Sequence, residues 1–372
     1  MNVTWILSNN SSAPYFNWFA QVAASKKEIN FTTICLHTEE PQMIKDMEKF
    51  GFKCYWIKYD YDKRKRGLIK SVFQLYKLFK KIKPDIIHSH LFDDTLASMV
   101  AGKLAGIKKR VITKGDSGFH YYYTPKWVRF DRYNNKWARV IVAISEENKD
   151  FIIEKEKAPE SKIAVIHHGL PLYEITHQTD EIKKEFISMY QLKHKTVIGT
   201  ICRFIEWKGY KQIVAAAEIL IPKNPDLIFL FTGKGQQKQD IEKIVKEKKL
   251  EKNILFTNWI DPSKIPSLFG IMTVYLHAAK NEPFGFVIAE AMLNGIPVVS
   301  TKTGAAADAI IHKKSGYLCE IENPVQLAEG IEYILKNNVN NCIGADGKKR
   351  AENLFTIEKM YAKHIALYKQ LL

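Results

Sequence analysis

Residues 282–293 read Glu-Pro-Phe-Gly-Phe-Val-Ile-Ala-Glu-Ala-Met-Leu, and this stretch predicts a tight turn that leads directly into an apolar helix. The apolar residues from Val287 onward have helical spacing, and Gly295 is a natural end for the helix. A helix N-terminus presents backbone N–H groups and a positive partial charge. The turn therefore predicts an anion site that suits phosphate, the alternative being an ordinary capped helix.

Two carboxylates flank this predicted anion site. Glu282 lies on the turn, and Glu290 lies on the helix that follows it. Both can accept hydrogen bonds from the hydroxyl groups of one ligand. Carboxylates beside a phosphate site predict a ligand that carries both a diphosphate and a polyol, as a nucleotide sugar does. Two solvated glutamates are the alternative interpretation.

Two cations follow a predicted buried strand at residues 197–202. Arg203 lies at the end of this strand, and Lys208 lies just before a helix that starts at Tyr210. Because open α/β sheets bind ligands at the carboxyl ends of their strands, both cations would reach the same sheet edge. A planar guanidinium and a point-charge ammonium both suit a diphosphate. The alternative is a pair of exposed surface cations.

Taken in order along the chain, these motifs resemble the donor half of the retaining GT-B glycosyltransferases of the large family 4. The resemblance also rests on Phe-Thr-Gly-Lys-Gly at residues 231–235 and Gly-Ile-Pro-Val-Val-Ser at residues 295–300. It covers nearly the whole chain. Each motif is weak on its own, but the ordered set is specific.

The resemblance implies a role for each of these residues. Arg203 and Lys208 would neutralise the donor diphosphate. Glu282 would face the transferred sugar, and Glu290 would face the nucleotide ribose. Backbone amides of the turn would complete the phosphate and sugar contacts. The donor-binding residues implied in this way are Arg203, Lys208, Gly233, Phe284, Gly285, Phe286 and Glu290.

Short apolar runs alternate with longer amphipathic ones in both halves, which is typical of βα units and parallel sheets. We therefore expect an α/β fold of GT-B architecture, in which two facing Rossmann-like domains enclose the site in a cleft. Residues 1–170 would form the acceptor domain and residues 171–355 the nucleotide-sugar donor domain. Residues 356–372 would form a helix that returns to the first domain. Strands are predicted at 3–7, 32–36, 54–57, 86–88, 110–113, 140–144, 163–166, 198–202, 228–232, 254–256, 274–276 and 298–300.

The remaining catalytic candidates lie in the first half. A loop at residues 114–123 follows a predicted strand and combines an aspartate, a histidine and several aromatic residues, as a sugar-binding rim would. The resemblance places a histidine near this point, facing the transferred sugar. Asp116 and His120 are both candidates beside Glu282, because the register is open. The alternative for His120 is a loop-capping role.

One segment departs from the family. Many members have a glycine-rich loop after the first strand, but residues 8–14 read Ser-Asn-Asn-Ser-Ser-Ala-Pro. Their hydroxyl and amide groups could still donate to a phosphate or an acceptor, but a glycine-cradled diphosphate contact is in doubt. Serine and asparagine are also ordinary turn and N-cap residues.

No metal and no cofactor are expected, because the nucleotide sugar is a substrate. Asp60-Tyr61-Asp62 matches the D-x-D pattern that holds a divalent ion in GT-A transferases, but four basic residues follow it directly. The donor motifs also lie in the other half of the chain. Arg203 and Lys208 can neutralise a leaving group in place of a metal. The histidines of His88-Ser89-His90 are expected to be structural, because no further metal ligands have supportive spacing.

The formal net charge of +16 and the pI near 9.3 imply an anionic partner or surface. Residues 63–83 contain nine basic residues and no acidic one, with an aliphatic stripe and a lysine stripe at helical spacing. One interpretation is a Rossmann helix with solvated lysines. The other is peripheral binding to anionic lipid, to which each basic residue adds about 1 kcal/mol.

The cysteines are scattered and odd in number, and no long apolar run is present, which together predict a cytoplasmic protein with reduced thiols. If the basic segment binds lipid, the protein would lie at the inner face of the membrane. The function expected is retaining transfer of a sugar from a nucleoside-diphosphate sugar to a hydroxyl acceptor, which a lipid could carry, in cell-surface polysaccharide or glycolipid synthesis. Two alternatives are a nucleic-acid-binding protein and a nucleotide-sugar epimerase or hydrolase. The first is disfavoured by basic residues spread over both halves without a recognised motif.

Overall fold

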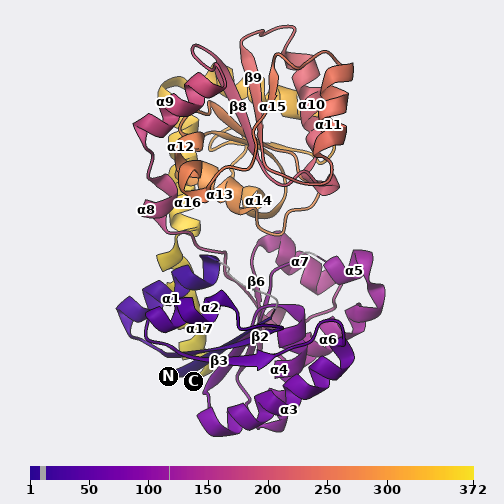
Figure 1. The fold of residues 1–372 in the computed structure, drawn as a ribbon, viewed down its shortest axis with the longest axis vertical. Coiled ribbons are helices and arrows are strands. Elements are labelled where there is room, and N and C mark those ends of the chain that lie inside the picture. Colours follow the sequence, from indigo (N-terminus) through magenta and orange to yellow (C-terminus); the bar gives the residue numbers. More distant parts are fainter. Residues whose placement is uncertain (9–13, 117) are drawn as a thin grey trace. The chain divides into compact units, whose positions relative to one another are not determined.

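The computed structural model describes residues 1–8, 14–116 and 118–372. Contacts divide these residues into two compact units (Figure 1). Unit 1 consists of Met1–Gly169 and Ile357–Leu372, and unit 2 consists of Leu170–Thr356. Unit 1 is therefore discontinuous in sequence, because its last helix comes from the C-terminal end of the chain.

The described part of unit 1 holds a seven-stranded parallel sheet in the order β3-β2-β1-β4-β5-β6-β7. The direction of winding reverses between β1 and β4, as in doubly wound folds. All seven strands predicted in this half of the sequence are present. They are β1 (Asn2–Ser8), β2 (Asn30–His37), β3 (Lys53–Lys58), β4 (Ile86–Ser89), β5 (Arg110–Lys114), β6 (Val140–Ala143) and β7 (Ile163–Val165).

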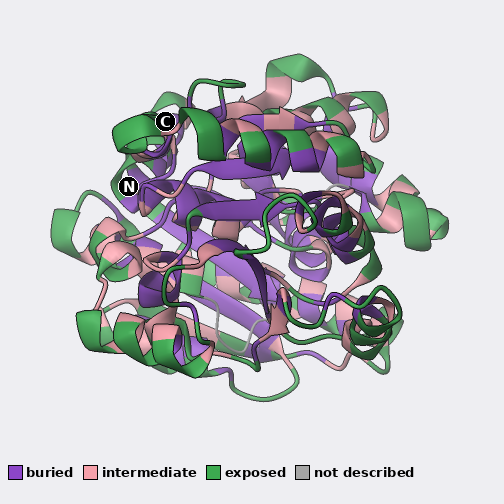
Figure 2. Cartoon of the chain, turned by 90° about the horizontal axis from the view of Figure 1, so that it is seen from above, coloured by how far each residue is buried: buried purple, intermediate pink, exposed green. Residues whose placement is uncertain are grey.

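Alternation along β1 builds two hydrophobic layers in unit 1. Trp5 packs on one face of the sheet with apolar residues of α1, α2 and α17, whereas Ile6 packs on the other face with α3 and α4. In Figure 2 the strands are buried and the outward sides of the helices are exposed. The helices of unit 1 are α1 (Pro14–Lys26), α2 (Gln42–Lys49), α3 (Arg64–Ile82), α4 (Phe92–Leu104), α5 (Phe119–Tyr123), α6 (Val128–Trp137), α7 (Glu146–Glu154) and α17 (Ile357–Leu371).

Helix α17 is tied to the first strand by side-chain hydrogen bonds. The indole of Trp5 donates to the Tyr368 hydroxyl over 2.9 Å, and that hydroxyl lies 2.6 Å from Nδ1 of His88. The other ring nitrogen of His88 lies 2.8 Å from Oγ1 of Thr113. The prediction that His88 is a structural histidine is confirmed by these bonds.

The described part of unit 2 holds a six-stranded parallel sheet in the order β10-β9-β8-β11-β12-β13. Five of its strands lie where the sequence predicts them, and β13 is additional. Its winding reverses between β8 and β11, which is the point where such sheets bind ligands. The strands are β8 (Thr196–Ile201), β9 (Leu227–Thr232), β10 (Ile254–Phe256), β11 (Val274–His277), β12 (Val298–Thr301) and β13 (Tyr317–Cys319).

Helices cover the unit 2 sheet as well. One face packs with α10, α11 and α15 around Ile198, Phe229 and Leu276, and α13 packs against α8, α14 and α16. In the described parts of the chain, no helix combines the length and the apolar composition needed to cross a bilayer. The helices of unit 2 are α8 (Leu172–Thr176), α9 (Asp180–Met189), α10 (Tyr210–Leu220), α11 (Lys238–Glu247), α12 (Ile265–Phe269), α13 (Phe286–Leu293), α14 (Gly304–Ala309), α15 (Pro324–Asn337) and α16 (Cys342–Leu354).

Candidate active site

The predicted donor residues of unit 2 gather at the carboxyl edge of its sheet, on loops that follow β8, β9 and β11 and on helix α13. The backbone N–H of Lys280, after β11, donates to the carbonyl of Trp207, after β8, over 2.8 Å. Gly233, after β9, has φ 144°, and a Cβ there would lie 2.1 Å from the carbonyl oxygen of Cys202. Only glycine permits this approach of the β8 and β9 loops. The loops on both sides of the winding reversal are therefore locked together.

Lys208 and Glu282 meet across this reversal. Lys208 lies in a short 3₁₀ helix, Glu206–Lys208, and its ammonium forms an ion pair with Oε2 of Glu282. Each of these two residues is only 8% exposed. The same carboxylate oxygen lies 3.0 Å from Nε2 of His277, the last residue of β11. A cation from one loop and a histidine from the adjacent strand thus hold one buried carboxylate.

Glu282 is ionised in this arrangement. Burial alone raises the pKa of its carboxyl, but the hydrogen bond from His277 and the charge of Lys208 outweigh burial and lower the pKa to about 2. Burial lowers the pKa of His277 below its usual value, so the ring is neutral. Because a carboxylate only accepts hydrogen bonds, Nε2 carries the proton and donates it.

Glu290 has a different environment on α13. Its side chain is partly buried and forms no hydrogen bond or ion pair with any residue that the structure describes. Burial raises the pKa of the Glu290 carboxyl to about 7. This carboxyl group can therefore accept ligand hydroxyls without first breaking a protein contact.

The turn between the two glutamates depends on glycine. Gly285 has φ 84° and precedes the first residue of α13. A Cβ there would lie 2.8 Å from Cδ1 of Ile288 and 2.9 Å from Cγ of Glu282. The carbonyl of Phe284 accepts a hydrogen bond of 2.6 Å from Ala305, which fixes the turn against the start of α14. Phe286 then opens α13, whose N-terminus lies at the same sheet edge as the carboxylates.

Arg203 is exposed directly after β8. Its guanidinium has no hydrogen-bond or ion-pair partner among the described residues, in contrast to the buried ammonium of Lys208. The two predicted diphosphate ligands are therefore not equivalent. One cation is available at the surface, and the other is held by Glu282.

His120 of unit 1 belongs to a buried network. Its Nδ1 lies 2.8 Å from Asp131, which also accepts from Lys114 over 2.8 Å. Burial raises the pKa of the Asp131 carboxyl, but His120 and Lys114 outweigh burial and lower it. Asp131 thus fixes the orientation of the imidazole.

Asp116 is instead exposed, and its Oδ1 accepts from the N–H groups of Gly118 and Phe119 over 2.9 and 2.8 Å. This carboxylate caps the start of α5, which carries His120. The structure thus gives Asp116 a capping contact, while the orientation of His120 is set by Asp131.

Two of the other predicted features, His90 and the D-x-D pattern, lie among the described residues. Residues 9–13 of the serine- and asparagine-rich segment lie outside the described residues. His90 is buried against Trp5, with ring centroids 4.3 Å apart, and neither of its ring nitrogens has a partner among the described residues. Asp60 of the D-x-D pattern accepts from the backbone N–H groups of Asp62 and Lys63, so its carboxylate caps the turn before α3.

Sequence reasoning does not single out His277 or Asp131. His277 gives a weak signal, as a polar residue at the end of an apolar strand and shortly before Glu282. Asp131 stands within a helix between aromatic and basic residues and gives no signal beyond ordinary helix polarity. Their roles depend on which side chains the fold brings beside them.

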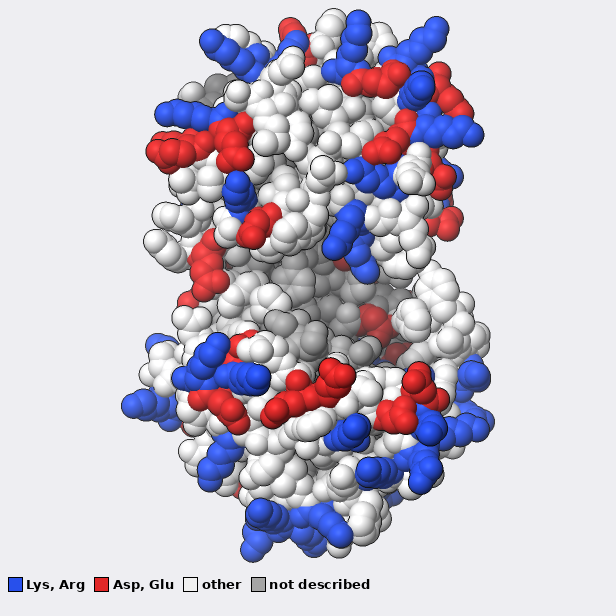
Figure 3. All heavy atoms as spheres, viewed as in Figure 1, with Lys and Arg blue, Asp and Glu red and all other residues white. Residues whose placement is uncertain are grey.

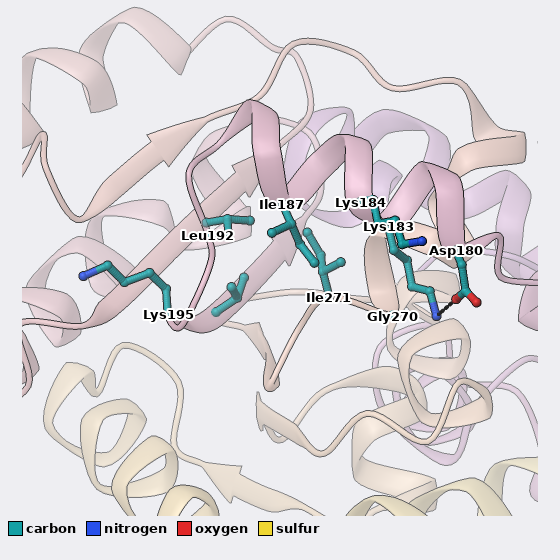
Figure 4. Close-up of a pocket in the computed structure, with 9 residues that line it drawn as sticks. Asp180, Lys183, Lys184, Ile187, Leu192, Lys195, Gly270 and Ile271 are labelled. Atoms are coloured by element: carbon teal, nitrogen blue, oxygen red, sulfur yellow. Dashed lines mark ion pairs between the residues drawn. The ribbon is translucent and has the colours of Figure 1, made fainter.

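A separate pocket of about 440 Å³ lies near the amino ends of the unit 2 strands (Figure 4). Lys183 and Lys184 of α9 line it with Ile187 and Ile271, and Lys183 is paired with Asp180 over 2.7 Å. None of the predicted donor residues lines this pocket. It is therefore distinct from the carboxyl-edge site.

Two family models together match most of the chain. Residues 183–351 match the model described as glycosyl transferases group 1, and residues 23–173 match the model described as glycosyltransferase family 4. The chain belongs to these glycosyltransferases. The first matched region lies within unit 2 and the second lies almost entirely within unit 1, so both halves of the enzyme support the assignment.

Similar proteins agree with this assignment. The glycosyltransferase is 25% identical over 323 residues to the capsular polysaccharide biosynthesis glycosyltransferase CapM of Staphylococcus aureus, covering 82% of this chain and 81% of the relative. It is 23% identical over 313 residues to the UDP-Gal:alpha-D-GlcNAc-diphosphoundecaprenol alpha-1,3-galactosyltransferase of Escherichia coli, covering 81% and 79%. The matches favour neither nucleic-acid binding nor an epimerase or hydrolase.

The crystal structure of Anabaena Alr3699/HepE in complex with UDP superposes with a TM-score of 0.83 at 17% identity, and all of both chains is covered. The enzyme therefore has the GT-B fold, with two Rossmann-like domains, as expected from its sequence.

Proposed function

We propose that this glycosyltransferase moves a sugar from a nucleoside-diphosphate sugar to a hydroxyl acceptor with retention of configuration at the sugar carbon. The observation that carries the proposal is the contact of Lys208 and His277 with Glu282 at the winding reversal of unit 2. An ionised carboxylate beside a buried cation suits a ligand with hydroxyls at one end and a diphosphate at the other.

On the donor side, we propose an exchange of partners. When a donor binds, the Lys208 ammonium turns from Glu282 to the diphosphate, which carries more negative charge. Glu282 keeps the hydrogen bond from His277 and accepts from hydroxyls of the sugar, and Arg203 adds a second cation from the surface. Glu290 accepts from the ribose hydroxyls.

We propose that the donor is a uridine nucleotide sugar, with uracil as its base. The E. coli relative is named for UDP-Gal, and the Anabaena neighbour is described in complex with UDP. The contacts that we propose for unit 2 involve phosphate, ribose and sugar, which other nucleotide sugars share. The base must therefore be tested against GDP and ADP donors.

For the chemistry, we propose that the acceptor oxygen attacks the sugar carbon on the face that the diphosphate leaves. The bond from this carbon to the diphosphate oxygen breaks as the bond to the acceptor oxygen forms, and the acceptor proton passes to the diphosphate. Arg203 and Lys208 stabilise the developing negative charge without a metal. His120, oriented by Asp131, is the group of unit 1 that we propose faces the sugar. Asp116 positions His120 by capping α5.

For the acceptor, we propose a lipid-linked hydroxyl compound of polysaccharide or glycolipid synthesis. The name of the E. coli relative specifies a diphosphoundecaprenol acceptor. An enzyme with such a substrate works at a membrane surface, and the basic segment 63–83 is the part of this chain that we propose for the contact.

The experiment is a thermal-shift series with UDP, GDP, ADP and their glucose and galactose conjugates. A nucleotide at 100 times its Kd should stabilise the protein by about 2.7 kcal/mol. We expect UDP and at least one UDP-sugar to raise the melting temperature of the wild type and to have a weaker effect on Arg203→Ala. If no nucleotide of the panel stabilises the wild type, the proposal is wrong.

A further inference from the structure

Helices α3, α4 and α6 of unit 1 lie in a row, with α4 in contact with both of the others. All residues of these helices are described, and their three acidic side chains, those of Asp93, Asp94 and Asp131, are buried. Asp93 forms an ion pair with Arg64 over 2.7 Å, and Asp94 accepts from backbone N–H groups at the start of α4. Each carboxylate is therefore used inside unit 1.

The exposed charge of the three helices is entirely positive, and Figure 3 shows lysine and arginine side chains gathered over α3. The three helices carry ten exposed cations and no exposed carboxylate, although Asp62, two residues before α3, is exposed. Such an excess of positive charge attracts anions over a distance set by the salt concentration. We call this surface the basic face. Its exposed cations are Lys65, Arg66, Lys70, Lys77, Lys80, Lys81, Lys103, Arg129, Arg132 and Lys136.

Four large apolar side chains of these helices are exposed among the cations: Leu104 of α4, Tyr133 of α6, and Ile69 and Phe73 of α3. Ile69 is 74% exposed and Phe73, one helical turn later, is 58% exposed. The ammonium of Lys77 lies 4.4 Å from the centre of the Phe73 ring. Leu75 and Phe79 fill the core on the inner side of α3, so Ile69 and Phe73 are not needed to hold the helix in place.

We propose that the basic face docks on an anionic lipid bilayer, with Ile69 and Phe73 inserted among the acyl chains. Adjacent apolar side chains surrounded by lysine and arginine are the pattern of helices that lie in a membrane interface. Nucleic acid fits this face less well, because bases stack on aromatic rings and an exposed aliphatic side chain offers them no ring. The bilayer would be the surface that carries the lipid-linked acceptor. Only this link to the acceptor rests on the proposed function.

The test is flotation of the full-length enzyme with vesicles of phosphatidylglycerol and phosphatidylcholine, and with vesicles of phosphatidylcholine alone. The wild type should bind the anionic vesicles at low salt. Changing Lys65, Arg66, Lys70 and Lys77 to Glu should weaken this binding at least tenfold. The matched control changes Lys193, Lys243, Lys246 and Lys252 of unit 2, which are also exposed, to Glu. This control should bind anionic vesicles at least tenfold more tightly than the variant of the basic face.

Insertion has a separate readout. The double variant Ile69→Ser with Phe73→Ser should still bind at low salt but should lose the binding that persists at about 0.5 M salt, because high salt leaves the apolar contribution. Val325→Ser with Val339→Ser, at exposed sites of unit 2, is the control and should behave as the wild type does. Transfer to a soluble acceptor should persist in all four variants.

The proposal is overturned if the wild type does not bind anionic vesicles at low salt. It is also overturned if both fourfold charge variants lose binding equally, since net charge alone would then explain the effect. A wild type that binds duplex DNA but not vesicles would assign the face to nucleic acid instead. Failure of nucleotide binding with intact vesicle binding would reject the proposed function and leave the docking surface standing.

Discussion

At the scale of single residues, Lys208 illustrates how the unliganded enzyme manages its charges. Its ammonium pairs with Glu282, although we propose that it neutralises a diphosphate when a donor binds. In the absence of a donor, the ion pair neutralises two buried charges. His277 allows Glu282 to remain hydrogen-bonded when Lys208 changes partner. A buried charge that loses its only partner is costly, so the histidine lowers the cost of the exchange.

This arrangement predicts different effects for the two cations. Lys208→Met leaves Glu282 with His277 alone and should cost about 1–3 kcal/mol of unfolding free energy. Arg203→Ala removes an exposed side chain and should change it by less than about 0.5 kcal/mol. Both variants should lose donor turnover. Urea unfolding and transfer assays on the same preparations measure the two effects, and equal stability of the two variants would contradict the observed pairing.

Glu290 predicts an opposition between stability and binding that depends on pH. Its pKa is about 7 in the folded protein and 4.5 as the ordinary value, so the folded state loses stability relative to the unfolded chain as pH rises from 4.5 to 7. Glu290→Gln should therefore be more stable than the wild type at pH 8 by about 1–3 kcal/mol, and close to it at pH 4. Its affinity for nucleoside diphosphate should nevertheless fall.

The measurements are thermal unfolding across this pH range and nucleotide titration at pH 8. Glu282→Gln is the comparison, because it should spare nucleoside-diphosphate affinity and impair sugar transfer. A Glu290→Gln enzyme that is less stable at pH 8 would mean that the carboxylate has a structural partner in solution.

At the scale of elements, most of the fold could be predicted, because strands and helices are encoded in local periodicity. The helix at α13 begins and ends where its apolar spacing and Gly295 predict, and α17 follows its own apolar stripe. β13 is missed because its run of Tyr-Leu-Cys is too short to show alternation. Local pattern suffices where an element is long enough to repeat.

The site could be predicted only in part. Glu282 and Glu290 stand in a recognisable turn and helix, but the partner of each depends on strand order. Lys208 reaches Glu282 because β8, which leads to Lys208, lies beside β11 in the sheet, and β11 leads to Glu282. Similarly, the contact of Trp5 with Tyr368 joins residues at opposite ends of the chain. No local pattern encodes these neighbours.

The bond between β1 and α17 predicts a stability effect. Tyr368→Phe removes the hydroxyl that accepts from Trp5 and bonds His88, which leaves two buried polar nitrogens without partners. The loss should be about 2–4 kcal/mol, because each unpaired group costs about 1–3 kcal/mol. Tyr361→Phe, on the same helix, is the control, because its buried hydroxyl has no partner in the described structure. Chemical denaturation that gives equal losses for the two variants would contradict this account.

At the scale of the whole molecule, the two units differ in how the chain builds them. Unit 2 is one continuous segment, whereas unit 1 needs both ends of the chain. The chain leaves unit 1 and returns to it at adjacent points, because Leu170 and Thr356 form a parallel bridge. A short connection can therefore replace unit 2 without disturbing unit 1.

Three fragments test this division. Residues 170–356 alone should fold cooperatively and bind nucleoside diphosphate. Residues 1–169 alone should aggregate, because the apolar face around Trp5 lacks α17. Joining residue 169 to residue 357 through a short glycine–serine linker should restore a monomeric, cooperatively folded unit 1. Circular dichroism and size-exclusion chromatography distinguish these outcomes, and a well-folded 1–169 fragment would show that α17 is dispensable.

The position of α17 at the end of the chain also determines when unit 1 can complete its folding during synthesis. A ribosome that releases about 5–20 residues per second needs about 10–40 s to pass from the end of the first segment of unit 1 to α17. Throughout that interval, the apolar layer around Trp5 and Phe19 lacks the residues of α17 that pack against it. The domain that is translated first is therefore expected to mature last, and this half-finished layer is where a chaperone would be needed.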